Sequence, residues 1–238
     1  MELYIKDIKI KYEVSGVGSP LIFLHGWGRN LSDFKKVSNQ IYDDFTVYLV
    51  DLPGFGESIM NNSLSVLEYA DVINKFCLSL AIINPIVVGH SFGGRVAIAY
   101  ASKYEVNRLV LVCSPGIKQK FNLVKYLKIK TYKVLKKLKI KNNMGSVDYK
   151  NSSNIMKETL VKAVNYDLSL EAKKITVPTL LVYGEKDRQV PLKIGKRLNS
   201  LIDNSALIVV PKCGHFPHIE RYRYFLIVLK SFIYGNKL

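Results

Sequence analysis

Residues 87–95 read V-V-G-H-S-F-G-G-R, and this stretch decides the fold. A buried-strand pattern ends just before Ser91, and the helical pattern F-G-G-R-V-A-I-A-Y begins just after it. Such a sharp strand-to-helix turn strains the backbone of its central residue, while Gly89 and Gly93 remove Cβ atoms that would collide there. The pattern G-H-S-F-G at 89–93 also suits a serine with a purely structural part in the turn. The rest of the chain must therefore decide whether Ser91 is a nucleophile or a structural residue.

Apolar runs without polar interruption recur along the chain, at 21–26, 46–51, 85–90, 109–113, 179–184 and 206–210. Runs buried on both faces are typical of a parallel sheet. Two earlier segments, 2–6 and 8–14, alternate apolar and polar residues, as half-buried edge strands do. Segments with helical spacing lie between the strands, at 31–42, 65–81, 92–104, 191–201 and 217–234. We therefore predict an α/β fold with a mostly parallel central sheet of about eight strands and helices on both faces.

The alternation of strand and helix breaks once, between Pro115 and Val177. This stretch is far longer than one crossover helix requires. We expect one core domain formed by residues 1–114 and 178–238, with residues 115–177 inserted as a helical lid above the carboxyl ends of the strands.

The chain has 238 residues and a net charge of +16. It lacks an apolar run of the roughly 18 to 20 residues that a membrane-spanning helix needs, and its N-terminus does not resemble a signal peptide. These features predict a soluble cytoplasmic protein. Three cysteines without metal-ligand spacing predict neither a disulfide framework nor a zinc site.

Much of the positive charge lies between Lys118 and Lys141, where ten lysines and no acidic residue occur. The stretch carries +10, which leaves +6 (16 minus 10) for the rest of the chain. Apolar residues at helical spacing predict a basic amphipathic helix over 121–141. Such a helix would attract an acidic carrier protein, an anionic lipid or a negatively charged substrate, or its lysines would only solvate the lid. No nucleic-acid recognition motif accompanies the charge.

Polar residues able to activate Ser91 follow two later strands. A serine nucleophile needs a base, and the base needs an acid that orients it. Asp187 follows the strand at 179–184, and His215 follows the strand at 206–210. All three therefore lie at strand carboxyl ends, where open α/β sheets bind ligands. His218 is an alternative base, and Glu185 and Asp203 are alternative acids.

Five motifs in this order resemble the α/β-hydrolase fold family, and specifically its lid-bearing serine hydrolases. They are H-G-W-G at 25–28, D-L-P-G-F-G-E-S at 51–58, G-H-S-F-G-G at 89–94, V-P-T-L-L-V-Y-G-E-K-D at 177–187 and G-H-F-P-H-I-E at 214–220. The resemblance implies that Ser91 is the nucleophile, His215 the general base and Asp187 the acid that holds the imidazole. Some family members place this acid one strand earlier, where this chain reads C-S-P-G-I.

The resemblance also implies an oxyanion hole made by the backbone N–H groups of Trp27 and Phe92. We expect His25 to buttress the oxyanion loop. Asp51 and Ser58 are interpreted as turn residues without a catalytic part.

The implied activity is hydrolysis of a carboxylic ester or thioester of a small to medium acyl substrate through an acyl-enzyme, with no cofactor or metal. One alternative is hydrolysis of a carbon-carbon bond in a vinylogous diketone. Relatives with that activity often carry tryptophan after the catalytic histidine, where this chain has Phe216. The other alternative is a ligand-binding protein that keeps the hydrolase scaffold without catalysis. The sequence leaves the oligomeric state open.

Overall fold

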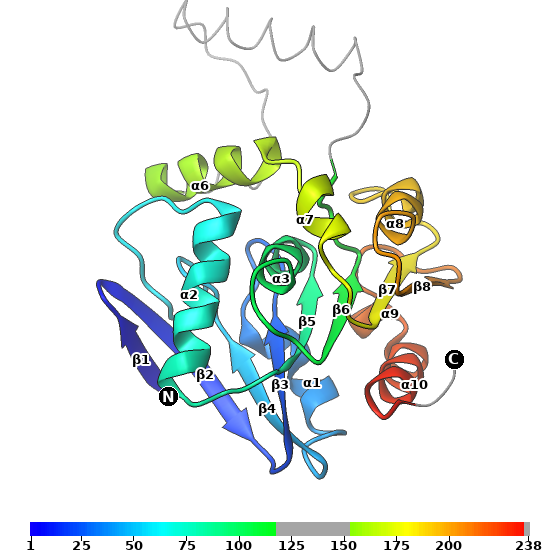
Figure 1. The fold of residues 1–238 in the computed structure, drawn as a ribbon, viewed down its shortest axis with the longest axis horizontal. Helices are drawn as coiled ribbons and strands as arrows, with labels where there is room; N and C mark the ends of the chain where they lie inside the picture. Colours follow the sequence, from blue (N-terminus) through cyan, green and yellow to red (C-terminus); the bar gives the residue numbers. More distant parts are fainter. Residues whose placement is uncertain (118–152, 236–238) are drawn as a thin grey trace, which may run out of the picture.

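The computed structural model describes residues 1–117 and 153–235 (Figure 1). Within these ranges the strands form an eight-stranded sheet of order β1-β2-β4-β3-β5-β6-β7-β8. β1 pairs antiparallel with β2, and β2 with β4, whereas the other neighbouring strands are parallel. The predicted fold class is confirmed. The strand bounds are β1 Glu2–Ile5, β2 Ile8–Ser15, β3 Ser19–Leu24, β4 Phe45–Val50, β5 Ile86–His90, β6 Arg108–Val112, β7 Thr179–Gly184 and β8 Ser205–Val210.

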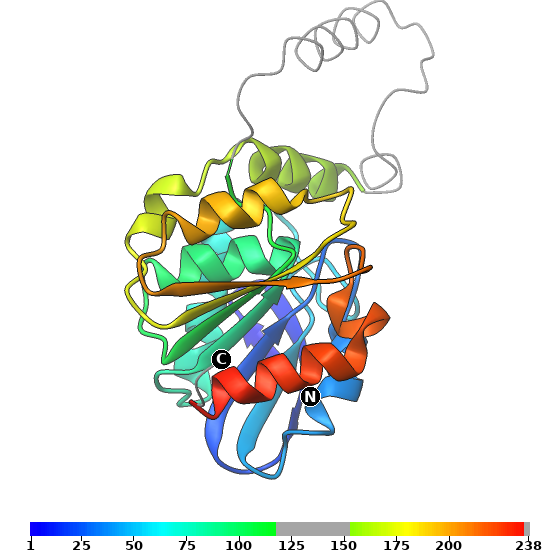
Figure 2. The same cartoon turned by 90° about the vertical axis from the view of Figure 1, so that its right-hand side faces the viewer.

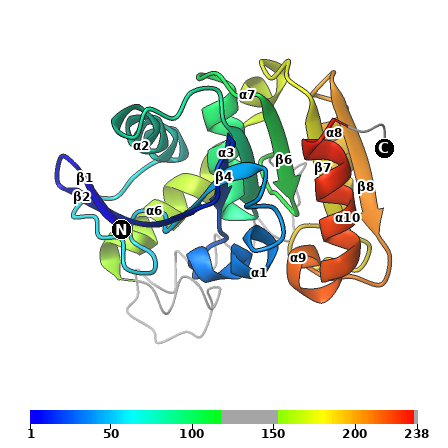
Figure 3. The same ribbon diagram turned by 90° about the horizontal axis from the view of Figure 1, so that it is seen from below.

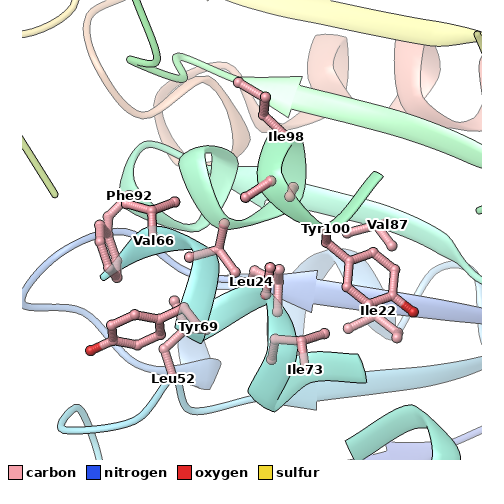
Figure 4. Close-up of a cluster of buried hydrophobic side chains, with 14 of the residues drawn as sticks. Ile22, Leu24, Leu52, Val66, Tyr69, Ile73, Val87, Phe92, Ile98 and Tyr100 are labelled. Atoms are coloured by element: carbon pink, nitrogen blue, oxygen red, sulfur yellow. The ribbon is translucent and has the colours of Figure 1, made fainter. Parts of the chain in front are cut away.

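Both faces of the central strands are buried, which explains their continuous apolar runs. In β3, Ile22 and Leu24 belong to one hydrophobic core, whereas Leu21 and Phe23 belong to a second core on the opposite face. Successive side chains of a strand point to opposite faces, so each central strand contributes to both cores. Figure 4 shows the first core, where Ile22 and Leu24 of the sheet meet side chains such as Tyr69 and Ile98.

Helices cover the two faces of the sheet, as Figures 2 and 3 show. The first core is completed by helices α2 (Val66–Ser79), α3 (Phe92–Ala101) and α8 (Leu192–Asn199). The second core is completed by α10 (Tyr222–Ile233) and by the short segment that includes α1 (Lys35–Ser38). The loops at the carboxyl ends of the parallel strands therefore share one edge between these two layers.

The prediction of a single helix at 31–42 is wrong. A 3-10 turn, η1 (Leu31–Phe34), is followed by only one turn of α-helix in α1. The Leu31 N–H donates to Oδ1 of Asp51 at 2.6 Å, and the Val17 N–H donates to the carbonyl of Tyr42 at 3.3 Å. These bonds to distant parts of the chain fix both ends of the segment, and a continuous helix does not form between them.

The helix predicted at 217–234 is also interrupted. It forms as α9 (Pro217–Glu220) and α10, separated by Arg221, whose backbone angles of φ −128° and ψ 44° are not helical. The Glu220 carboxylate accepts hydrogen bonds from the N–H groups of Gly214 at 2.7 Å and Phe216 at 3.0 Å. This side chain ties α9 back to the loop after β8, and α10 starts in a new direction.

The described part of the segment predicted to be a lid, residues 115–177, contains α6 (Asn154–Asn165) and α7 (Ser169–Lys173). Figure 1 shows α6 crossing above one end of α2. The lysine-rich stretch and the basic helix predicted at 121–141 lie outside the described residues. In the described ranges, no helix combines the length and the apolar character needed to span a membrane.

Candidate active site

Ser91 occupies the sharp turn between β5 and α3. Its backbone lies at φ 49° and ψ −112°, a conformation that L-residues adopt only under strain. The Ser91 N–H donates to the carbonyl of Val112 in β6 at 2.9 Å, and the Ser91 carbonyl accepts from Arg95 at 3.2 Å. The turn is thus fixed to the neighbouring strand on one side and to the first turn of α3 on the other.

Two glycines make room for this turn. A Cβ atom on Gly89 would lie 2.5 Å from the carbonyl oxygen of Gly93, and one on Gly93 would lie 2.2 Å from the carbonyl oxygen of Leu24. Real Cβ atoms essentially never come this close to backbone oxygens. The glycines of the quoted stretch therefore allow β5, α3 and β3 to approach one another under Ser91.

The structure brings Ser91, His215 and Asp187 together. His215 Nε2 lies 3.0 Å from Ser91 Oγ, and His215 Nδ1 lies 2.7 Å from Asp187 Oδ2. Because an ionised carboxylate only accepts hydrogen bonds, Nδ1 carries the proton in this contact. The unprotonated Nε2 of neutral His215 is then free to accept the Ser91 hydroxyl proton.

Asp187 is held in place through both carboxylate oxygens. While Oδ2 contacts His215, Oδ1 accepts the N–H groups of Gln189 at 2.8 Å and Val190 at 2.9 Å. Burial opposes ionisation of Asp187, but the hydrogen bonds from His215 and from these backbone groups outweigh it and lower the pKa of Asp187. The acid is therefore ionised and oriented at neutral pH.

The alternative acids and the alternative base lie elsewhere. Glu185 Oε2 accepts the backbone N–H of Lys212 at 2.8 Å, and Asp203 is exposed after α8. His218 is buried and stacks on Phe34 with ring centroids 4.6 Å apart. The geometry therefore favours Asp187 and His215 over these three alternatives.

The loop of H-G-W-G lies against the start of α3. Leu52 N–H donates to His25 Nε2 at 3.0 Å, so His25 Nδ1 carries the proton and donates to the carbonyl of Gly26 at 2.8 Å. The His25 carbonyl in turn accepts from Gly93 at 3.0 Å. His25 thus stabilises the loop, which is the part we expected it to play.

Trp27 and Phe92 lie side by side, with ring centroids 5.1 Å apart. Phe92 is the first residue of α3, where backbone N–H groups have no acceptor within the helix. Phe55 packs edge-on against Trp27, with centroids 4.9 Å apart. The two residues predicted to form the oxyanion hole are therefore neighbours, one of them directly after Ser91, and Phe55 packs against the other.

Asp51 and Ser58 have structural partners. Oδ2 of Asp51 accepts the Glu57 N–H at 2.8 Å, and the Ser58 hydroxyl donates to the Asp51 carbonyl at 2.7 Å. Ser58 Oγ also accepts the backbone N–H of Lys11 at 2.8 Å. These bonds close the D-L-P-G-F-G-E-S turn, as the sequence interpretation expects.

Sequence reasoning missed Cys113, which lies beside the acid. Among the described residues, Cys113, Asp187 and His215 form the group whose side-chain atoms lie close enough together to hold a metal ion. These atoms are all within 4.8 Å of one another. Burial raises the pKa of the Cys113 thiol, so it stays protonated. His215 and Asp187 are already hydrogen-bonded to each other, an arrangement suited to proton transfer. The position of Cys113 directly after β6, at a strand carboxyl end like Asp187 and His215, was the available signal.

Arg95 is a second residue that sequence reasoning missed. It lies in the first turn of α3 and is buried, and its guanidinium donates to the carbonyls of Ala163 and of Tyr166, the latter at 2.6 Å. Burial lowers the pKa of Arg95 to about 10. These carbonyls lie at the C-terminal end of α6, where a cation interacts favourably with the helix dipole. Arg95 therefore attaches α6 to the helix that carries Ser91.

The arrangement of Ser91, His215 and Asp187 can transfer a proton from a hydroxyl to an imidazole. An alkoxide formed in this way attacks an electrophilic carbonyl, and N–H groups at the start of a helix favour the negative charge that develops. This chemistry is nucleophilic acyl transfer.

Comparisons with known proteins agree with this geometry. A family model described as alpha/beta hydrolase fold matches residues 19–132 and 125–222. The pimeloyl-[acyl-carrier protein] methyl ester esterase of Vibrio cholerae is 28% identical over 87% of this chain and 91% of its own length. The protein of the same name from Wigglesworthia glossinidia brevipalpis is 30% identical, over 93% of this chain and 96% of its own length.

A solved esterase structure from Exiguobacterium antarcticum superposes with a TM-score of 0.78 at 24% identity, covering 95% of this chain and 96% of that one. This likeness concerns the fold. The family match spans most of the chain, and the resemblance inferred from the five motifs is confirmed. The chain belongs to the α/β hydrolase fold family.

Proposed function

We propose that this protein hydrolyses the carboxylic ester of an acyl group attached to an acidic carrier protein, with Ser91 as nucleophile, His215 as base and Asp187 as orienting acid. The observation that carries the chemistry is the continuous contact from Asp187 Oδ2 through His215 to Ser91 Oγ, at 2.7 and 3.0 Å. The broader class is established by relationship: the chain is an esterase-type serine hydrolase, as the sequence predicted.

The reaction proceeds in two halves. Ser91 Oγ bonds to the ester carbonyl carbon while His215 Nε2 takes the hydroxyl proton, and the oxyanion is held by the N–H groups of Trp27 and Phe92. Collapse of this intermediate breaks the bond to the alcohol, which leaves with the proton from His215. Water then attacks the acyl-enzyme and gives a proton to His215. The second intermediate collapses as the bond to Ser91 Oγ breaks, His215 returns the proton to Ser91, and the free acid is released. Asp187 keeps the imidazole in the productive tautomer throughout.

The carrier-linked substrate is inferred from the curated relatives and from charge. Relatives that align over nearly the whole chain are named as esterases of a pimeloyl-[acyl-carrier protein] methyl ester. The net charge of +16 favours association with an acidic protein partner. We infer that the excess of lysine and arginine side chains attracts the carrier and that the chemistry lies with Ser91.

Hydrolysis of pimeloyl-carrier methyl ester by the purified protein tests this proposal. Mass spectrometry of the carrier distinguishes loss of the methyl group, expected for an ester hydrolase, from release of the whole acyl chain, expected for a thioesterase. We also expect the KM for the carrier-linked ester to rise with salt, while the KM of a small uncharged methyl ester stays constant, because screening weakens only the charged encounter.

Ser91→Ala is the control for catalysis. If the wild-type protein hydrolyses small esters but not the carrier-linked ester, the chemistry stands and the carrier substrate is wrong. Turnover of a vinylogous diketone without ester hydrolysis would favour the carbon-carbon bond alternative. Full biological complementation by Ser91→Ala would favour the ligand-binding alternative.

A further inference from the structure

His90, the residue directly before Ser91, contacts the loop that carries the catalytic base. It is the last residue of β5 and only 1% exposed. Its Nε2 lies 2.9 Å from the backbone carbonyl oxygen of His215. Because a carbonyl oxygen only accepts, His90 Nε2 must carry a proton in this bond. His90 therefore donates a buried hydrogen bond to the main chain of the base itself.

The other side of the His90 ring faces the H-G-W-G loop at residues 25–28, called here the oxyanion loop. Nδ1 has no hydrogen-bond partner among the described residues. A Cβ atom on Gly26 would come within 2.8 Å of this nitrogen, so only glycine permits the loop to lie so close. The imidazole is thus wedged between the backbone of the oxyanion loop and the backbone of the base loop, next to the nucleophile in sequence.

Aromatic packing, and not a second hydrogen bond, sets the orientation of this ring. The His90 centroid lies 4.6 Å from that of His218 and 5.1 Å from that of Phe216. His218 is itself stacked on Phe34. His218 and the half-buried Phe216 both belong to the stretch that follows His215, so the ring of His90 packs directly against the loop that carries the base.

The environment of His90 suits a neutral donor. Burial lowers its pKa well below the ordinary value, and the neighbouring His218 and His215 add to this effect. The His215 ring lies 4.9 Å away and becomes an imidazolium during catalysis. A second cation at His90 would repel that imidazolium at close range, whereas the neutral tautomer donates to His215 without this cost.

We propose that His90 is a positioning residue, whose Nε2–H bond to the His215 carbonyl holds the base at hydrogen-bond distance from Ser91. The inference rests on the roles proposed for Ser91 and His215. A displacement of about 1 Å in a catalytic group can cost roughly 100-fold in rate, so the loss of one well-placed support is measurable.

The test is a matched pair of variants. His90→Gln keeps an N–H donor at a similar reach, while His90→Met has nearly the same shape as glutamine and no donor. The readouts are kcat and KM for a small methyl ester, and the rate at which a fluorophosphonate labels Ser91. In that reaction Ser91 Oγ bonds to phosphorus, fluoride leaves and His215 takes the proton, so the rate reports the base without depending on the natural substrate.

We expect His90→Met to lose roughly 10- to 100-fold in kcat and in labelling rate with KM unchanged, and His90→Gln to stay within about threefold of the wild type. Equal losses in both variants would overturn the inference, because packing alone would then explain His90. So would wild-type rates in His90→Met. If His90→Met does not fold, as judged by circular dichroism, His90→Leu replaces it. Absence of labelling in the wild type would instead contradict the roles of Ser91 and His215.

Discussion

Asp187 Oδ2 lies 2.7 Å from His215 Nδ1, while Oδ1 of the same carboxylate accepts two backbone N–H groups. The acid is therefore fixed before any substrate binds. A pre-oriented carboxylate costs no reorganisation during the reaction, which is the basis of electrostatic catalysis in preorganised sites. The same contact also fixes which nitrogen of His215 faces Ser91.

Replacement of this carboxylate gives the first prediction. Asp187→Asn should keep the fold but favour the wrong His215 tautomer, because an amide N–H cannot accept the Nδ1 proton. We expect kcat for a small ester to fall roughly 10³- to 10⁴-fold. Asp203→Asn is the control, since this exposed acid lies away from His215 and its loss should leave kcat unchanged. A decrease of less than tenfold in Asp187→Asn would contradict the assigned role.

Backbone strain at Ser91 gives the second prediction. At φ 49° glycine is unstrained, whereas serine and alanine, which carry a Cβ atom, are strained. We expect Ser91→Gly to exceed Ser91→Ala in free energy of unfolding by about 1 kcal/mol in urea denaturation. Ser79, exposed at the end of α2, is the control position. There the order should reverse, because alanine is the better helix former. Equal free energies of unfolding for Ser91→Gly and Ser91→Ala would show that the turn carries no strain.

The third prediction concerns pH and His218. Burial lowers the pKa of His218 to about 4 from an ordinary value of 6.5, and neither ring nitrogen has a hydrogen-bond partner among the described residues. The unfolded chain thus binds a proton between these pH values that the folded chain does not. The stability associated with neutral His218 is complete above pH 6.5 and is lost as pH falls toward about 4.

His218→Phe removes this titration while keeping a flat ring against Phe34. We expect the variant to gain stability relative to the wild type by roughly 3 kcal/mol as pH falls from 6.5 to 4, at about 1.4 kcal/mol per pKa unit. Chemical denaturation at several pH values measures this difference. Parallel stability curves for the two proteins would contradict the assignment.

The fourth prediction concerns the attachment of α6. Arg95→Met keeps an apolar stem of similar length but removes the guanidinium donor from the carbonyls of Ala163 and Tyr166, although Ala163 still accepts the Tyr166 N–H. We expect the amides of α6 to exchange with solvent roughly 10-fold faster, since loss of a buried donor costs about 1 to 3 kcal/mol. Hydrogen-exchange mass spectrometry of residues 154–165 measures this. Arg95→Lys, which keeps a cation, should show a smaller change, and unaltered exchange in Arg95→Met would mean that other contacts hold α6.

Much of the fold could be predicted because its signals are local. The apolar runs of β3, β5 and β7 reflect burial on both faces, and the glycines around Ser91 reflect the close approach of backbone atoms. Helix limits were predicted less well. The segment at 31–42 has helical spacing, yet its ends are fixed by Asp51 and Val17, which are distant in sequence.

The sequence by itself determined the order of strands and helices, the turn at Ser91 and the presence of Asp187 and His215 after later strands, because periodicity and residue type act over a few neighbouring positions. Only the tertiary structure decided the hydrogen bonds between these groups and the supporting contact made by His90. Ser91 and His215 are 124 positions apart, and His90 lies 125 positions from the carbonyl that it holds. Such contacts depend on how the two cores pack against the sheet, and no local pattern encodes a hydrogen bond across that distance.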